Sequence, residues 1–212
     1  MKERMHEIAM KSNSDVKISI IPGHFATNHS HVNYYVDLTR IKTNHKVAME
    51  AGKEIAASYS LSKPIDTIVC LEGTEILGSF IAYSLAQNGS GINAGKEINV
   101  ITPELNMNNQ LIFRDNIQEM VENKQILLLM SSVSTGKTIR RSVDCLQYYN
   151  GHLAGVSAIF SAVDHIDGIE INSLFKNDDM PHYETELPSQ CQMCAAGKKV
   201  EAIINSFGYS KI

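Results

Sequence analysis

The stretch Gln125-Ile-Leu-Leu-Leu-Met-Ser-Ser-Val-Ser-Thr-Gly-Lys-Thr138 is the most informative part of this chain. Its first six residues are apolar apart from Gln125, which is typical of a strand buried on both faces of a parallel sheet. A polar loop follows, and a helical pattern runs from Gly136 to about Tyr149, before Gly151. Backbone N–H groups and hydroxyls that converge at the start of a helix bind anions. We therefore expect a phosphate site made of Ser134, Thr135, Gly136, Lys137 and Thr138.

This loop also has two less favoured interpretations. In the first, Ser134 and Thr135 only cap the helix, although capping does not require a glycine and a lysine in the first turn. In the second, the loop is the P-loop of a nucleoside-triphosphate hydrolase. A P-loop requires glycine where this chain has Ser131, and it usually follows the first strand, so the P-loop interpretation is weaker.

Strands and helices alternate on both sides of this segment. Residues 66–71 form a second apolar strand, followed by Glu72-Gly73-Thr74-Glu75 and a helix to about Gln87. We expect further strands at residues 16–21, 31–38, 98–102 and 153–163, and a further helix at residues 45–60. This order predicts an α/β fold with a mainly parallel sheet of about five strands flanked by helices, and ligands at the carboxyl ends of the strands.

The two ends of the chain are expected to add to this core. Residues 2–11 carry apolar side chains on one face of a predicted amphipathic helix, and Val200, Ile203, Ile204 and Phe207 also have helical spacing. We expect a single domain with three parts. These are an N-terminal helix and hood strands at residues 1–43, the α/β core at 44–170 and a C-terminal tail at 171–212.

Composition excludes several functional classes. A chain of 212 residues with 43% hydrophobic residues can bury a sizeable core. The formal net charge of −4 gives no general attraction for nucleic acid or anionic lipid, and no apolar run approaches the length of a membrane span. The first residues lack the pattern of a secretory signal, and four cysteines are too few for a disulfide scaffold. We expect a cytoplasmic protein without nucleic-acid or membrane partners.

Several motifs together resemble the type I phosphoribosyltransferases, and within them the orotate-type enzymes. The strand and loop at residues 127–138 align with the family's phosphoribosyl motif without a gap. Tyr34-Tyr-Val-Asp-Leu38 is similar to an early strand of the family, and residues 71–78 lie where a diphosphate-contacting loop is expected. The pattern Cys191-x-x-Cys194-x-x-Gly197 is similar to the tail of several orotate-type enzymes.

The resemblance implies a fold, an activity and a set of ligands. It implies the type I phosphoribosyltransferase fold with a small hood over the base, lined by Tyr35 and Asp37. It implies a glycosyltransferase of nucleotide metabolism that transfers a pentosyl group, 5-phosphoribosyl, from its diphosphate to a nitrogen base with Mg²⁺. Backbone amides at residues 135–138 would hold the 5-phosphate, Glu72, Gly73 and Thr74 would contact pyrophosphate, and the enzyme would be a homodimer.

The chain departs from the family pattern at residues that carry charge. The family's acidic pair beneath the ribose is replaced by Met130 and Ser131, and its Arg-Lys dipeptide by Thr102-Pro103-Glu104. Residues 103–113 contain no lysine or arginine. A nucleoside monophosphate or a sugar phosphate therefore fits this site better than phosphoribosyl diphosphate, and the alternative function is a catalytically impaired nucleotide-binding or regulatory module. The carboxylates that could replace the pair geometrically are Glu72, Glu75, Asp164 and Asp167. The simpler interpretation is that these residues are solvated acids in loops.

Cys191 and Cys194 form half of a tetrahedral zinc site. The other ligands must come from elsewhere, with His182 or a second copy's tail as candidates; a redox pair and ordinary tail cysteines are the alternatives. His24, His29 and His31 lie in one polar loop, which is an ordinary place for histidines, and a metal site there is the less favoured alternative.

Overall fold

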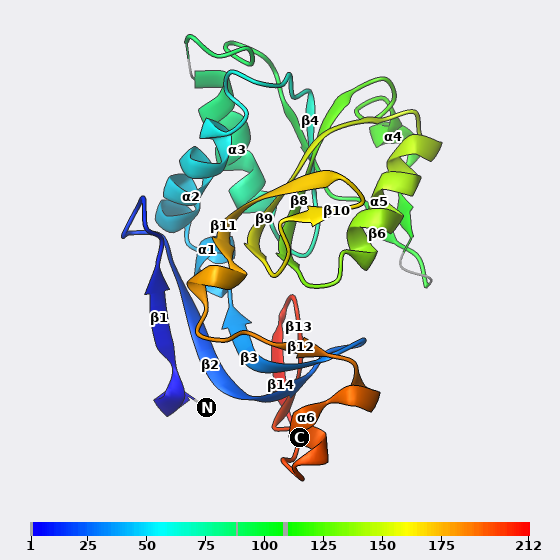
Figure 1. Ribbon diagram of the computed structural model, residues 1–212. Coiled ribbons are helices and arrows are strands. Elements are labelled where there is room, and N and C mark those ends of the chain that lie inside the picture. The colour runs from blue at the N-terminus through cyan, green and yellow to red at the C-terminus, as the bar shows by residue number, and fades with distance from the viewer. Residues whose placement is uncertain (1, 88, 108–109) are drawn as a thin grey trace.

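Two six-stranded sheets form the two parts of the molecule, a core and a hood (Figure 1). The structure is a computed structural model, and it describes residues 2–87, 89–107 and 110–212. The core sheet has the strand order β10-β11-β9-β8-β4-β5. Its strands are β4 (Thr67–Cys70), β5 (Asn99–Ile101), β8 (Gln125–Val133), β9 (His152–Ser161), β10 (His165–Ile166) and β11 (Ile169–Lys176).

The core sheet is parallel except at its β10 edge. The prediction of a mainly parallel α/β sheet flanked by helices is therefore confirmed. The strand that opens the 125–138 segment is central, with Ile126 to Ser131 fully buried, because it lies between β4 and β9 and is covered on both faces.

Helices cover the two faces of this sheet. On one face, α2 (His45–Ala57) and α3 (Glu75–Gln87) pack on Leu127 and Leu129 of β8. On the other face, α5 (Lys137–Tyr148) packs on Leu128 and Met130. Asn44 caps α2, since its side chain accepts hydrogen bonds from the N–H groups of Lys46 and Val47. The short helices α1 (Thr39–Thr43) and α4 (Asp115–Gln118) and the hairpin of β6 (Glu104–Leu105) and β7 (Leu111–Ile112) complete this part.

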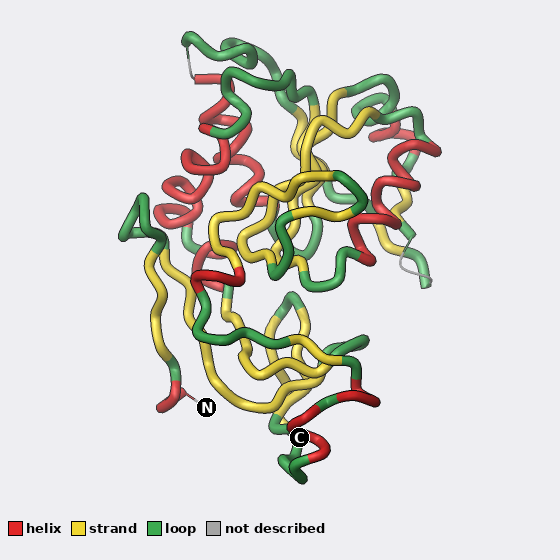
Figure 2. Tube along the Cα trace, viewed as in Figure 1, coloured by secondary structure: helices red, strands yellow, loops and turns green. Residues whose placement is uncertain are grey.

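The hood combines both ends of the chain in one sheet of order β12-β3-β2-β13-β14, with β1 paired to β2. Its strands are β1 (His6–Ala9), β2 (Lys17–Ala26), β3 (His31–Asp37), β12 (Thr185–Glu186), β13 (Ala202–Asn205) and β14 (Gly208–Lys211). The strand β2 continues past Pro22-Gly23, where an end was expected, because a register irregularity between Pro22 and Phe25 accommodates the proline. Strand and loop make up most of the hood, whereas the long helices lie against the core (Figure 2).

Both predicted terminal helices are wrong. Residues 2–9 form the 3-10 turn η1 (Lys2–Arg4) and β1, because β1 gains pairing with β2 that a short isolated helix lacks. The tail after Gly197 forms β13 and β14, and the side chains of β13 alternate between buried and exposed.

The core sheet also extends to Lys176 of β11, beyond the expected boundary at 170. The turn η2 (Asn177–Asp179) connects it to the hood, and η3 (Pro188–Gln190) and α6 (Gln192–Ala195) lie between the hood strands β12 and β13.

No helix in the described part of the chain is long and apolar enough to cross a bilayer.

Candidate functional site

A cavity of about 590 Å³ is lined by residues of both the core and the hood. Its core wall is formed by the loops after β4 and β8 and by the first turns of α5. Its hood wall is formed by the turn at residues 27–30 and by the tip of the β13–β14 hairpin. Of the predicted site residues, it is lined by Ser134, Thr135, Gly136, Lys137, Thr138, Glu72, Gly73, Tyr35 and Met130.

The 134–138 loop turns from β8 into α5 at Gly136. This glycine has φ of +72°, and a Cβ atom there would lie 2.3 Å from Cδ1 of Ile166. Both the left-handed backbone conformation and the collision with Ile166 therefore disfavour a side chain at this position. The helix start carries no hydrogen bond from a capping side chain. Ser134 and Thr135 therefore do not cap α5, and its first residues, Lys137, Thr138 and Ile139, line the cavity.

Two basic side chains of α5 line the cavity beside this loop. Lys137 and Arg141 are one helical turn apart, so both lie on the same face of the helix. Arg140 instead pairs with Asp167, with 2.7 Å from Nε to Oδ2, and donates to the carbonyl oxygen of Thr135. Sequence reasoning missed Arg141, although its spacing of four residues from Lys137 was a usable signal.

A carboxylate from the loop after β4 reaches Ser131 near the end of β8. Met130 and Ser131 are buried, and Met130 packs in the apolar cluster under α5. The Oε2 atom of Glu72 accepts hydrogen bonds from the Ser131 hydroxyl at 2.6 Å, the Ser131 N–H at 3.2 Å and the Ser132 N–H at 3.4 Å. Glu72 has φ of +61°, a strained conformation for a residue with a side chain, and Gly73 follows with +78°.

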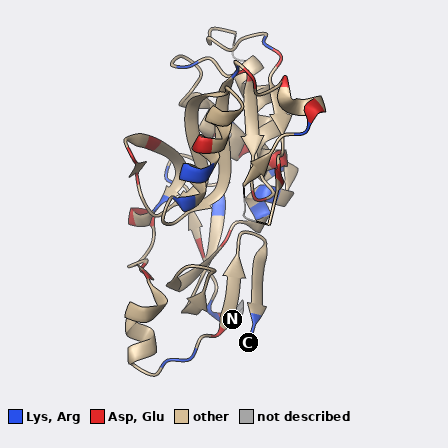
Figure 3. Ribbon diagram, turned by 90° about the vertical axis from the view of Figure 1, so that its right-hand side faces the viewer, with Lys and Arg blue, Asp and Glu red and all other residues tan. Residues whose placement is uncertain are grey.

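The other three candidate carboxylates are engaged away from this point. Glu75 lines the cavity and accepts a hydrogen bond of 3.0 Å from the Thr102 hydroxyl. Asp164 pairs with Lys176, and Asp167 pairs with Arg140; each hydrogen bond lowers the pKa of the carboxyl. Basic and acidic side chains are interspersed along the ribbon as a whole (Figure 3). Glu72 is thus the carboxylate that reaches the end of β8.

No protein-family model matches the chain. An orotate phosphoribosyltransferase of Thermoanaerobacter sp. (strain X514) is 24% identical over 186 residues, which is 85% of this chain and 88% of the relative. The adenine phosphoribosyltransferase of Thermoanaerobacter pseudethanolicus superposes with a TM-score of 0.52 at 15% identity, covering 82% of this chain and 96% of that one. The protein has the type I phosphoribosyltransferase fold. A further similar structure is the orotate phosphoribosyltransferase of Mycobacterium tuberculosis H37Rv in complex with 5-phospho-α-D-ribosyl 1-diphosphate. It gives a TM-score of 0.50 at 16% identity, and the match covers 69% of this chain and 83% of that chain.

The predicted resemblance to type I phosphoribosyltransferases is therefore confirmed. In this phosphoribosyltransferase fold, the loop at residues 72–74 is held by a lysine that sequence reasoning missed. Lys42 Nζ donates to the carbonyl oxygen of Glu72 at 3.1 Å and to that of Ser206, at the hairpin tip. Burial lowers the pKa of Lys42. The contact joins the core loop to the hood, and no local pattern around residue 42 signals it because both partners are distant in sequence.

The described part of the β6–β7 hairpin, whose Leu105 lines the cavity, adds no free positive charge to it. Arg114, the nearest arginine after the 103–113 segment, forms an ion pair of 2.6 Å with Glu104 across the β6–β7 hairpin. Both side chains are exposed there. Among the described residues, this hairpin offers no unpaired cation to the cavity.

Among the hood residues of the phosphoribosyltransferase fold, Tyr35 lines the cavity and Asp37 does not. The Asp37 carboxylate accepts a hydrogen bond of 2.9 Å from the Thr39 N–H at the start of α1. Tyr35 contacts the rings of Phe25 and Tyr209 edge to face, and burial raises its pKa to about 12. Thr74 also lies behind the cavity wall, where its hydroxyl donates to the carbonyl oxygen of Leu71.

The tail cysteines lie on the outer side of the hood. Cys191 and Cys194 approach His24 and His31, not His182, whose carbonyl oxygen accepts a hydrogen bond from Asn33. All four cysteines of the chain are free thiols.

Proposed function

We propose that this protein transfers a 5-phosphoribosyl group between diphosphate and a nitrogen base, in the manner of the orotate-type phosphoribosyltransferases. The observation that carries the proposal is the Glu72 carboxylate at Ser131, next to the 134–138 loop. The Thermoanaerobacter orotate enzyme, which is 24% identical to this chain, supports the same chemistry.

In this proposal the 134–138 loop binds the 5-phosphate. Backbone N–H groups at the start of α5 donate to the phosphate oxygens, since no side chain caps this helix. Lys137 and Arg141 add positive charge at the cavity wall. Gly136 is required because the ligand approaches backbone that has no room for a side chain.

Glu72 takes the place of the family's acidic pair. A carboxylate beneath the ribose would accept hydrogen bonds from the ribose hydroxyls and stabilise the positive charge that develops on the sugar ring during transfer. All three donors to Glu72 bind Oε2, and among the described residues none donates to Oε1, which is left for the ligand. A hydrogen bond to a charged group contributes about 1.5–3 kcal/mol, or about ten- to hundred-fold in rate.

The diphosphate would lie against the loop after β4. Glu72 and Gly73 both have positive φ, and successive N–H groups in such a conformation form a concave anion site. Gly73 lines the cavity, whereas Thr74 contributes only through its backbone because its side chain is buried.

Mg²⁺ fits this site as a partner of the diphosphate rather than as a tightly held ion. Mg²⁺ is usually bound by one or two carboxylates together with substrate phosphates. Glu75 is the carboxylate at the cavity wall that would hold it, since Glu72 is bonded to Ser131 and Ser132. The ion would neutralise charge on the leaving diphosphate. This neutralisation is the more important because the described part of the β6–β7 hairpin adds no free positive charge to the cavity.

The expectations of a homodimer and of a cytoplasmic location stay part of this proposal. Leu105, Met107 and Phe207 are large apolar side chains that are exposed around the cavity and the β6–β7 hairpin. A second copy of the chain would cover such surface. Sedimentation of the purified chain tests the dimer directly.

A nucleotide-binding module without transfer activity is the second candidate. It is favoured by the pairing of Arg114 with Glu104 and by the apolar Met130, which leave the diphosphate side weakly charged. Such a module would bind nucleoside monophosphates through the 134–138 loop alone.

One set of assays separates the two functions. The protein is incubated with phosphoribosyl diphosphate, Mg²⁺ and either orotate or a purine base, and pyrophosphate release is measured. Turnover with one of these bases excludes the binding module. Submillimolar binding of a nucleoside monophosphate without turnover excludes the transferase. Gly136→Asp should abolish ligand binding, whereas Gly95→Asp, at a glycine of similar φ with open space around it, should not.

A further inference from the structure

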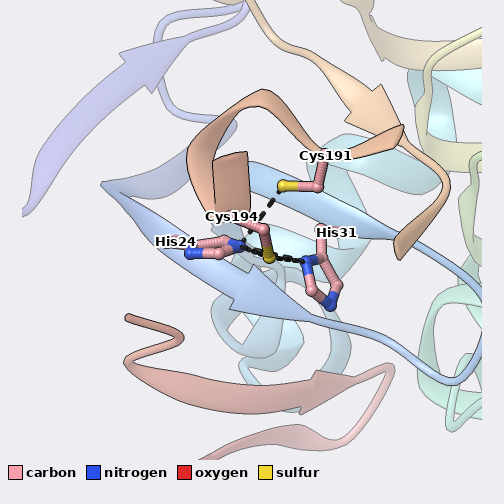
Figure 4. Close-up of side chains that lie close together, drawn as sticks. All are labelled: His24, His31, Cys191 and Cys194. Atoms are coloured by element: carbon pink, nitrogen blue, oxygen red, sulfur yellow. Dashed lines mark hydrogen bonds between the residues drawn. The ribbon is translucent and has the colours of Figure 1, made fainter. Parts of the chain in front are cut away.

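Four metal-binding side chains from distant parts of the chain meet at one point on the hood. His24 comes from β2 and His31 from β3, while Cys191 is the N-cap residue of α6 and Cys194 lies within that helix (Figure 4). One ring nitrogen of each histidine and the two sulfur atoms all lie within 4.8 Å of one another. In sequence, the two pairs are separated by up to 170 residues, so this convergence is a product of the hood sheet.

Four of the six separations among these atoms match the edges of a zinc tetrahedron, and the other two are within 4.8 Å. Zn–S bonds of about 2.3 Å and Zn–N bonds of about 2.05 Å place two nitrogens about 3.3 Å apart and a sulfur about 3.6 Å from a nitrogen. His24 Nε2 lies 3.0 Å from His31 Nδ1 and 3.5 Å from Cys191 Sγ. Cys194 Sγ lies 3.8 Å from His24 Nε2 and 3.3 Å from His31 Nδ1. Each separation is within about 0.3 Å of the tetrahedral value.

The second ring nitrogen of His24 is held as in metal sites. Its Nδ1 lies 2.7 Å from the carbonyl oxygen of Lys198. A carbonyl only accepts, so Nδ1 carries the proton and Nε2 presents its lone pair to the cluster. A ligating histidine almost always donates its other N–H to such a partner, which fixes the tautomer and the orientation of the ring.

We propose that His24, His31, Cys191 and Cys194 bind one structural Zn²⁺ ion. Two thiolates and two imidazoles in a tetrahedron are a closed donor set that suits Zn²⁺ and leaves no position for a substrate. His24 and Cys191 are almost fully buried, whereas Cys194 is exposed, so an ion can enter from the side of α6.

The ion joins the two chain segments that build the hood wall of the cavity. Residues 27–30, between the two histidines, line the cavity. The segment after Cys194 leads to β13, which pairs with β2 at Ala202 and Phe25 and carries the hairpin tip at the cavity. Zinc would therefore hold both segments of the hood wall in place without contacting the ligand in the cavity.

Metal analysis of the 212-residue chain tests this inference without any activity assay, so its outcome is independent of the proposed function. The untagged chain, produced in medium with zinc and purified without chelators, should contain about one zinc per chain by elemental analysis. Exchange to Co²⁺ should give the intense visible absorption of a tetrahedral site and a thiolate-to-metal charge-transfer band.

Matched variants identify the ligands. Cys194→Ser and His31→Ala should lower the zinc content at least about ten-fold at equal free zinc, since even loss of a ligand's hydrogen-bond partner has an effect of this size in known sites. Cys145→Ser and His29→Ala, outside the cluster, should keep the full content. Where a ligand variant does not fold, the Co²⁺ spectrum of the wild-type protein decides. A folded wild-type protein without metal, a Cys191–Cys194 disulfide in thiol titration, or a Co²⁺ form without thiolate bands would overturn the proposal.

Discussion

Glu72, in the loop after β4, accepts a hydrogen bond of 2.6 Å from the hydroxyl of Ser131 on the neighbouring strand β8. The carboxylate is held by two backbone N–H groups as well, and its backbone has the strained φ of +61°. Strain of this kind persists where the surrounding structure fixes it, and it is concentrated at functional sites. The chain thus lacks the acidic pair at the end of β8 and receives a carboxylate there from the loop after β4.

Glu72→Gln should lower kcat/KM for phosphoribosyl transfer about ten- to hundred-fold, because the amide keeps the shape of the side chain and loses its charge. Steady-state pyrophosphate release measures the change. The control is Asp164→Asn, which neutralises a carboxylate at the same edge of the sheet that is paired with Lys176 outside the cavity. Equal effects of the two substitutions on kcat/KM would show that Glu72 has no specific role in the reaction.

Gly136→Ala should weaken binding of a nucleoside monophosphate at least about ten-fold and destabilise the fold by about 1–3 kcal/mol, because the new Cβ collides with Ile166. Gly95→Ala has the same positive φ, +71°, but open space around it. Calorimetric titration and urea unfolding of both variants separate backbone strain from the collision. Unchanged affinity in Gly136→Ala would place the phosphate elsewhere.

Replacing both Lys137 and Arg141 by glutamine should weaken nucleotide binding about ten-fold at low salt and flatten its dependence on ionic strength, since two charges near the phosphate are removed. Affinity is measured at several salt concentrations. Lys46→Gln, on the exposed side of α2, is the control. A salt dependence that survives the double substitution would show that other charges attract the ligand.

Tyr35 should make the fold sensitive to alkali. Its pKa is raised from 10.0 to about 12, because burial disfavours the phenolate. A pKa raised in the folded state contributes stability that is complete below the unfolded pKa and is lost as pH rises toward the folded value. Between about pH 9 and about pH 11, this corresponds to a loss of about 1.4 kcal/mol in the free energy of unfolding.

The comparison of wild type with Tyr35→Phe by urea unfolding at both pH values isolates this contribution. Tyr148→Phe, at a tyrosine that is 80% exposed, should behave like wild type. The same alkaline loss in Tyr35→Phe and wild type would contradict the assignment.

Removal of metal should loosen the hood and spare the core. A chelator should lower the melting temperature by at least about 5 °C, since an ion that binds only the folded state stabilises it. Hydrogen exchange should increase at residues 24–31 and 198–205, next to the cluster, and stay slow in β8. Faster exchange throughout the chain would indicate global unfolding, and no change would indicate that chelation removes nothing that holds the hood.

Much of the core follows from local sequence. The apolar run at residues 125–130 and the glycine at 136 predict a buried strand, a tight turn and a helix, and each is present. Strand-period and helix-period patterns are properties of a few consecutive residues, so they can be found without knowledge of the partner elements. The spacing of Lys137 and Arg141 on α5 is a local pattern of the same kind.

The two ends of the chain show where local patterns fail. Ile203, Ile204 and Phe207 have helical spacing, yet residues 202–205 form a strand. A parallel strand partner, β2, becomes available only after the chain has folded back over nearly its whole length. Pairing with a distant strand satisfies backbone groups and buries alternate side chains, and this outweighs a weak helical preference.

The sequence by itself determined the parallel core, the 134–138 loop and the loss of acidic residues at positions 130 and 131. Only the tertiary structure decided that the Glu72 carboxylate lies against Ser131, and that His24 and His31 lie beside the cysteine pair. The physical reason is that turns, caps and buried strands depend on neighbouring residues, whereas side chains that meet across strands depend on sheet order and register, which no local pattern encodes.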